Sequence, residues 1–199
     1  MAEVSDSAFV ADLSIPGTHY TATFNTSNQF AKCQSDSMNF INQLQWGVRA
    51  FDLRLSENMN FFHGNYFMHA SLNNFLADVT GFLAAHPSEF VIAFVSNENC
   101  DSDKGASFNQ NFQSLVANYY KYILIDKDIQ NYRVGDLRGK IVIITRNKNP
   151  YTCGWIDGAP MITWPDNTTN YSTAACSGCM VTGICDVYHT DRDSKMFQL

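Results

Sequence analysis

Two histidines, an aspartate and an arginine have the residue types and the spacing needed to cleave a phosphodiester. His19 follows the motif SIPGT, Asp52 and Arg54 lie two residues apart in GVRAFDLRL, and His63 is followed by a glycine. Imidazole titrates near neutral pH, so one histidine can accept a proton from an attacking hydroxyl while the other donates one to a departing alcohol. The planar guanidinium of Arg54 can hold two phosphate oxygens and offset the charge that develops on them. Together these side chains predict general acid–base cleavage of a phosphodiester.

Asp52 and Arg54 are expected to lie on one face of a β-strand that extends from Val48 to Leu55. Side chains alternate along an extended segment, so residues two apart point the same way. Such an acid and base can also form an ordinary ion pair, and either histidine alone can be an ordinary structural residue. The prediction of a site therefore depends on the joint occurrence of all four side chains.

Apolar periodicity predicts strands that alternate with helices. The expected strands are Ala11–Ile15, Val48–Leu55, Met59–His63, Phe90–Val95, Lys140–Thr145 and Gly183–Tyr188, and the expected helices are Ser35–Gln45, Ser71–Ala85 and Phe108–Tyr119. This alternation, with fully apolar strands, is typical of an α/β fold of parallel β-α units, and candidate residues at strand ends fit a TIM-type β/α barrel. A closed barrel needs about eight strands and about six are found, so we expect residues 1–199 to form a single, truncated barrel domain that lacks its late strands.

Composition excludes several classes of partner. The chain has a formal net charge of −6, a pI near 5.2 and no Lys/Arg cluster, which argues against a nucleic-acid partner. It contains no run of about eighteen apolar residues that would indicate a transmembrane segment, and its first ten residues lack the pattern of a signal peptide. Aromatic residues make up 14% of the chain, enough for some rings to enter a lipid interface. We therefore expect a globular protein that meets membranes only at their surface.

Cysteines and glycosylation sequons indicate secretion, with the cytoplasm as the alternative location. The six cysteines are Cys33, Cys100, Cys153, Cys176, Cys179 and Cys185, and the Asn-x-Ser/Thr acceptors are Asn25, Asn167 and Asn170. A zinc site is the competing interpretation of the late cysteines. Only Cys176 and Cys179 have ligand-like spacing, and no second such pair accompanies them, so zinc is disfavoured. The sequence does not determine the disulfide pairing.

Five sequence blocks follow one another between Ser14 and Arg146. They are SIPGTH at Ser14–His19, GVRAFDLRL at Gly47–Leu55, HG at His63–Gly64, the FL-x-x-HP-x-E-x-VI pattern at Phe82–Ile92 and LRGKIVIITR at Leu137–Arg146. In order and spacing they resemble the phosphatidylinositol-specific phospholipase C X-domain family, in its metal-independent, bacterial-type branch. The resemblance implies a distorted TIM barrel that cleaves phosphatidylinositol at a membrane surface into diacylglycerol and a cyclic inositol phosphate.

The resemblance also implies roles for individual residues. His19 matches the general base that deprotonates the inositol 2-hydroxyl, and His63 matches the general acid that protonates the departing diacylglycerol oxygen. Arg54 matches a phosphate-binding arginine that replaces the calcium of the eukaryotic branch, so no metal or other cofactor is expected. Asp52 matches the acid that orients this arginine. Asp186 is a further candidate for substrate binding, or for the carboxylate that orients the general base.

Two departures from the family pattern keep other functions open. Tyr20 stands after His19 where the bacterial pattern has an acid, and the family carboxylate that orients the general base comes from a late strand. The chain could therefore be a catalytically silent module that binds lipid head groups or inositol phosphates, or a fragment of a longer enzyme. Calcium-dependent cleavage is less favoured because the relevant position is Arg54 and not a carboxylate. Glycerophosphodiester hydrolysis on the same barrel is less favoured because acidic metal ligands are not found around Asp52.

Overall fold

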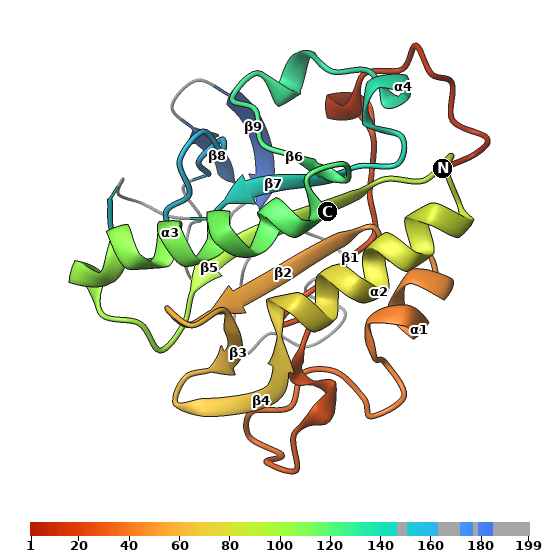
Figure 1. Ribbon diagram of the computed structural model, residues 1–199. Helices are drawn as coiled ribbons and strands as arrows, with labels where there is room; N and C mark the ends of the chain where they lie inside the picture. The colour runs from red at the N-terminus through yellow and green to blue at the C-terminus, as the bar shows by residue number, and fades with distance from the viewer. Residues whose placement is uncertain (147–150, 163–171, 177–178, 185–199) are drawn as a thin grey trace.

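The computed structural model describes residues 1–146, 151–162, 172–176 and 179–184, the last two ranges by their backbone alone. A mixed 7-stranded sheet forms its centre (Figure 1), with strand order β4-β3-β2-β5-β7-β6 and with β1 beside β2. The strands are β1 (Gly17–Thr18), β2 (Ala50–Leu55), β3 (Asn60–His63), β4 (Tyr66–Ser71), β5 (Val91–Asn97), β6 (Ile123–Leu124) and β7 (Ile141–Thr145). The strands β1, β2, β5, β7 and β6 are parallel, whereas β3 pairs antiparallel with β2 and with β4.

Helices connect these strands. They are α1 (Phe40–Gln45), α2 (Leu72–Ala85), α3 (Gly105–Val116) and α4 (Val134–Leu137), with short 3-10 turns at Val10–Asp12, Thr23–Asn25, Ser102–Lys104, Ala117–Tyr119 and Ile129–Asn131. The longer helices α2 and α3 cover the same face of the sheet (Figure 1) and contribute to one hydrophobic cluster. A separate antiparallel hairpin consists of β8 (Ser172–Cys176) and β9 (Cys179–Ile184). No helix among the described residues is long and apolar enough to cross a membrane.

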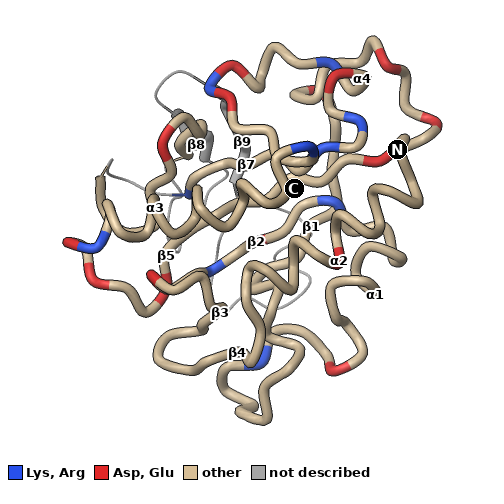
Figure 2. The backbone as a smooth tube through the Cα atoms, viewed as in Figure 1, with Lys and Arg blue, Asp and Glu red and all other residues tan. Residues whose placement is uncertain are grey.

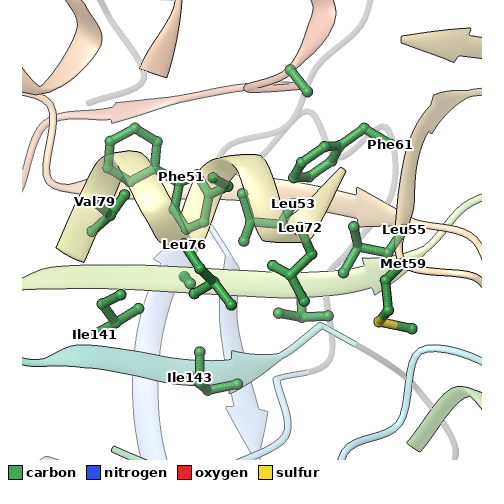
Figure 3. Packing of buried hydrophobic residues seen from close by; sticks show 14 of the residues in the cluster. Phe51, Leu53, Leu55, Met59, Phe61, Leu72, Leu76, Val79, Ile141 and Ile143 are labelled. Carbon is green, nitrogen blue, oxygen red and sulfur yellow. The ribbon is translucent and has the colours of Figure 1, made fainter. Parts of the chain in front are cut away.

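Alternation along β2 separates the core from the polar face. Phe51, Leu53 and Leu55 are fully buried and pack beneath α2 (Figure 3), which contributes Leu72, Leu76 and Val79 to the same cluster. The ring of Phe51 lies 5.3 Å from that of Phe75 on α2. Because side chains alternate, Asp52 and Arg54 point to the opposite face of the sheet, as the sequence predicts.

The central strands β5 and β7 are buried on both faces. On one face, Val91, Ala93 and Val95 join the cluster under α2 and α3. On the other face, Phe90 and Ile92 belong to a second cluster. Its further buried members are Val10, Ile129, Val134, Leu137, Val142, Ile144 and Ile162. This second face is the interior side of the sheet, from which Asp52 and Arg54 project, because Asp52 is in register with Phe94 and Arg54 with Ser96.

Several predicted elements are confirmed and two need correction. The predictions around β2, β3, β5, β7, α2 and α3 agree with the structure to within a few residues. The strand expected at Ala11–Ile15 is wrong, because Val10–Asp12 form a 3-10 turn and hydrogen bonding to the β2 segment begins only at Pro16. The helix expected at Ser35–Gln45 begins at Phe40, since Ser35 and Met38 close a separate turn and Asn39 caps the helix.

The sequence patterns do not predict the strands β4 and β6. Strand β4 has the sequence YFMHAS, in which only Met68 and Ala70 are buried, and β6 has only two residues. The strand expected at Gly183–Tyr188 overlaps β9 at its first two residues, and its remainder lies outside the described residues. Charged residues are dispersed along the described chain without a basic cluster on one side (Figure 2).

Two of the cysteines form a disulfide bond in the structure. Cys100, just after β5, forms a disulfide with Cys153, in the segment that follows β7. Cys33 is a free thiol. The Cα atoms of Cys176 and Cys179 are partners across the β8–β9 hairpin, but their side chains lie outside the description. Of the three sequons, Asn25 is exposed, and Asn167 and Asn170 fall outside the described residues.

Candidate active site

The four predicted catalytic side chains converge at the carboxyl ends of β1, β2 and β3. His19 directly follows β1, Asp52 and Arg54 lie on β2, and His63 ends β3. Close approach of β1 to β2 depends on Gly17, because a Cβ there would lie 3.1 Å from both the Cβ and the carbonyl oxygen of Ala50. The glycine of SIPGTH thus lets its histidine lie beside Asp52.

Asp52 is a buried carboxylate on which several donors converge. It accepts hydrogen bonds from Arg54 Nε at 3.2 Å, from the backbone amide of Tyr20 at 3.1 Å and from Arg146 Nη1 at 3.4 Å. Burial alone would raise the pKa of Asp52, but the two guanidinium groups and these hydrogen bonds outweigh burial and hold the pKa below its usual range. Asp52 is therefore ionised at neutral pH.

His19 has one ring nitrogen close to this carboxylate. Its Nδ1 lies 3.4 Å from Asp52 Oδ2, and its side chain is 49% exposed. A carboxylate at Nδ1 favours the tautomer with hydrogen on Nδ1, which leaves Nε2 able to accept a proton. Asp52 thus lies beside the predicted general base, while the orienting carboxylate expected from a late strand, with Asp186 as its candidate, stays a prediction because Asp186 lies outside the described residues.

His63 is oriented by a backbone carbonyl. Its Nδ1 lies 2.8 Å from the oxygen of Ala31. A carbonyl oxygen only accepts hydrogen bonds, so Nδ1 carries the hydrogen and Nε2 is the nitrogen left to exchange a proton. His19 and His63 are thus held by different acceptors, one charged and one neutral.

Tyr20 lies among these side chains. Its hydroxyl oxygen accepts a hydrogen bond from Arg54 Nη1 at 2.7 Å, and its ring centroid is 3.8 Å from that of His63 and 4.5 Å from that of His19. Burial, opposed by Arg54 and assisted by Glu98 and Asp52, raises the pKa of Tyr20 to about 12. Its phenol is neutral at physiological pH.

Two charged residues of the site escaped the sequence analysis. Glu98, just after β5, has Oε2 3.5 Å from Arg54 Nη1, while its Oε1 accepts the backbone N–H of Gly64 at 2.7 Å. Arg146, just after β7, contacts Asp52. Both follow apolar strands at their carboxyl ends, where the sites of β/α barrels collect, and that signal could have found them. The carbonyl of Ala31 carries no side-chain signal.

The site is rich in cationic and proton-exchanging groups. In the described part of the chain, no cluster of three or more His, Cys, Asp or Glu side chains is arranged to hold a metal ion. Burial would lower the pKa of Arg54, but Asp52, Tyr20 and Glu98 together raise it, so its guanidinium stays charged. Two proton-exchanging nitrogens beside a fixed guanidinium suit acid–base chemistry on an anionic ester.

Comparison of the sequence with known proteins identifies relatives. Residues 13–147 match the model of the family described as phosphatidylinositol-specific phospholipase C, X domain. The 1-phosphatidylinositol phosphodiesterase of Listeria monocytogenes is 34% identical over 155 residues, which cover 74% of this chain and 48% of the relative. The enzyme of the same name from Staphylococcus aureus strain Newman is 25% identical over 206 residues, covering 98% of this chain and 66% of the relative. The chain thus spans about half the length of the Listeria protein.

Solved structures of the same kind share the fold. The phosphatidylinositol-specific phospholipase C of L. monocytogenes superposes with a TM-score of 0.64 at 32% identity, over 74% of this chain and 56% of that one. A pentafluoro-Phe variant of the S. aureus enzyme gives a TM-score of 0.79 at 24% identity, over 99% of this chain and 68% of that one. These neighbours confirm the predicted TIM-like α/β fold. Because the family model matches well over half of its residues, the chain belongs to the phosphatidylinositol-specific phospholipase C X-domain family.

Proposed function

We propose that this protein is a phosphodiesterase that cleaves phosphatidylinositol-type phospholipids to diacylglycerol and a cyclic inositol phosphate. The single observation that carries the proposal is the pairing of two differently oriented histidines, His19 on Asp52 and His63 on the Ala31 carbonyl, beside Arg54. The names of the relatives, 1-phosphatidylinositol phosphodiesterase, support the same substrate class.

The reaction balances with the groups present. His19 Nε2 accepts the proton of the inositol 2-hydroxyl as its oxygen forms a bond to phosphorus. The bond from phosphorus to the glycerol oxygen breaks, and protonated His63 donates its Nε2 proton to that oxygen. Arg54 offsets the charge on the non-bridging phosphate oxygens, and Asp52 stabilises the imidazolium that forms on His19. After release of diacylglycerol, His19 is protonated and His63 is neutral, so a proton exchange with water restores the starting state.

The positive charge at the phosphate comes from Arg54 in this mechanism. Its guanidinium is fixed by Asp52 on one side and by Glu98 on the other, and a divalent cation at the same position would be repelled by it. We therefore expect turnover that does not depend on calcium.

Exposed aromatic rings near His63 are suited to a membrane surface. Phe30 is 87% exposed and precedes Ala31, whose carbonyl holds His63. Tyr66, 52% exposed, is paired with His63 across the β3–β4 hairpin, and Phe67 follows it. Rings that border the site can enter the interface while the polar face stays in contact with lipid head groups. The disulfide between Cys100 and Cys153 supports a secreted location, because such bonds persist in oxidising compartments.

Release of cyclic inositol phosphate from phosphatidylinositol vesicles tests the proposal. The wild-type chain, His19→Ala and His63→Ala are assayed in EDTA and with added calcium. His86→Ala is the matched control, because His86 is exposed at the end of α2 and its ring contacts Phe82. Turnover in EDTA that both active-site variants lose, and the control keeps, supports the proposal. Turnover that survives either active-site substitution contradicts it.

A silent binding module is the second candidate, favoured by the position of Tyr20 against Arg54 and His63. An inositol phosphate would then raise the melting temperature of the protein without any turnover of lipid. The same vesicle assay separates the two functions, since cyclic product excludes the silent module.

In either case we propose that residues 1–199 form one phospholipase-type domain. The intact mass of the natural product tests whether this domain is part of a longer enzyme.

A further inference from the structure

The side chain of Tyr20 contacts three of the proposed catalytic side chains at once. Its ring meets His63 at 3.8 Å and His19 at 4.5 Å between centroids, and the Cζ atom of Arg54 lies 3.8 Å from the ring centroid. A phosphate in the proposed mechanism must touch the same three side chains. The phenol therefore takes up space that the substrate needs.

We infer that the Tyr20 side chain occupies the place where a phosphate would bind Arg54 and so keeps the site closed. A phosphate group then binds by displacing this side chain. The inference rests on the proposed function of the site and adds a regulatory step to it. Tyr20 acts in this scheme as an internal ligand of Arg54, which the substrate replaces.

Hydrogen bonding at Arg54 supports displacement. Its Nε is directed to Asp52, and its Nη1 donates to the Tyr20 hydroxyl at 2.7 Å, with Glu98 at 3.5 Å. The phenol is uncharged, so this bond has a charge on one partner only. A phosphate oxygen carries charge of its own, and ion-to-ion hydrogen bonds to arginine are stronger. A phosphate is thus the better ligand for the same nitrogen.

The backbone of Tyr20 is anchored independently of its ring. Its N–H donates to Asp52 Oδ2, and the next amide, of Thr21, donates to the Asp52 carbonyl. The ring can therefore rotate away while the carboxylate of Asp52 keeps its amide donor. The backbone has φ of 45°, a left-handed conformation that bulky residues rarely adopt and that asparagine adopts more readily. This makes asparagine a suitable replacement for removing the ring.

The space beside Arg54 is small as long as Tyr20 covers it. Tyr20, Asp52 and Arg54, together with Phe61 of β3 and Met68 of β4, line a narrow pocket that has no room for a water molecule. Because Tyr20 is part of its lining and its ring is stacked on His63, loss of the ring would enlarge the pocket beside Arg54 and uncover the face of His63. A smaller side chain at position 20 should therefore admit phosphate more easily.

Calorimetric titration with inorganic phosphate tests the inference without any need for turnover. The proteins are the wild type, Tyr20→Asn, Tyr20→Phe and the control Tyr120→Asn, which changes a tyrosine that is 70% exposed between α3 and β6. If the closed state dominates, removal of the ring should tighten phosphate binding on the order of 10-fold, and removal of the hydroxyl alone should give a smaller gain. The control should bind phosphate as the wild type does.

A second substitution identifies the partner of the phosphate. Arg54→Gln in the Tyr20→Asn background should abolish the gain in affinity, and a gain that persists would overturn the inference. Phosphate affinity of both Tyr20 variants that is equal to or weaker than that of the wild type would also overturn it. Tyr20→Phe keeps the ring contacts, so this comparison holds even if Tyr20→Asn is unstable.

Vesicle turnover of the same variants separates the inference from the proposed function. A lower KM in Tyr20→Asn with an unchanged kcat supports closure. A lower kcat with unchanged phosphate affinity assigns Tyr20 to the positioning of Arg54 and overturns closure. Tighter phosphate binding in variants that all lack turnover supports closure while it refutes the phosphodiesterase proposal.

Discussion

Asp52→Asn removes one negative charge from a point on which two arginine side chains and a histidine converge. The side chains of Asp52, Arg54 and Arg146 are 12%, 13% and 11% exposed, so solvent screens this network weakly. Loss of one partner from a buried ion pair leaves the other charges uncompensated, at a cost of about 3–5 kcal/mol. Taking the lower value, and about 2–4 °C per kcal/mol for a chain of this size, the melting temperature should fall by roughly 6–12 °C.

The stability lost in Asp52→Asn should depend on pH in a defined direction. The pKa of Asp52 is lowered in the folded protein, so the unfolded chain binds a proton at a higher pH than the folded chain does. The stabilisation is therefore complete above the unfolded pKa of about 4, and it is lost as pH falls through the lower folded pKa. The difference between wild type and variant should be constant from pH 7 to pH 5 and should shrink below about pH 4.

Urea unfolding of both proteins at pH 7, 5 and 3 measures this difference. Asp36→Asn is the matched control, because Asp36 is 82% exposed and pairs with Lys32 on the surface, where an ion pair contributes about 0–1 kcal/mol. A loss at pH 7 no larger than that of the control, or a loss that does not shrink at pH 3, would refute the assignment of Asp52 as the charged centre. Vesicle turnover should fall on the order of a thousandfold, since His19 loses its orienting carboxylate.

Three further predictions concern separate parts of the molecule. Arg54→Lys keeps the charge, but its single ammonium group cannot hold Asp52 and a phosphate oxygen at once as Nε and Nη1 do. Cyclic product release should therefore fall roughly 100-fold or more, and near-normal turnover would contradict this role of the guanidinium. Glu89→Gln breaks the ion pair between Arg49 Nε and Glu89, 2.7 Å apart, and should lower the free energy of unfolding in urea by about 1–3 kcal/mol. The active site should stay intact, so a parallel loss of kcat would contradict a purely structural role for this pair. Cys100→Ser opens a loop with a sequence separation of 53 and should cost about 2–4 kcal/mol by the same assay, whereas unchanged stability would argue against the Cys100–Cys153 disulfide.

Local rules were sufficient for the elements with strong patterns. The apolar alternation of β2 correctly predicts that Asp52 and Arg54 share a face, since Phe51, Leu53 and Leu55 take the buried one. Helix α2 was predicted almost in full, because Ser71 caps it and its apolar residues recur at helical spacing. In both cases, neighbours within a few residues determine the conformation.

Contacts between distant segments were beyond those rules. The acceptor for His63 is the backbone carbonyl of Ala31, and any residue type would provide that oxygen. The position of Tyr20 depends on a positive φ that its residue type does not favour and that a loop imposes. Glu98 and Arg146 needed the strand ends to be aligned before their side chains could be assigned to the site.

The contact between His19 and Asp52 depends on a strand register that the sequence analysis does not assign. The sequence predicts both His19 and Asp52 as site residues but does not place them in contact, and Asp186, the candidate partner of His19 from a late strand, lies outside the described residues. The structure pairs β1 with β2 in parallel, with Gly17 opposite Ala50 and Thr18 opposite Phe51. The next pair along the same register is His19 and Asp52, and residues in register on neighbouring strands project from the same face of a sheet. Alignment of the SIPGTH and GVRAFDLRL segments as adjacent parallel strands would therefore have predicted the 3.4 Å contact between His19 Nδ1 and Asp52 Oδ2.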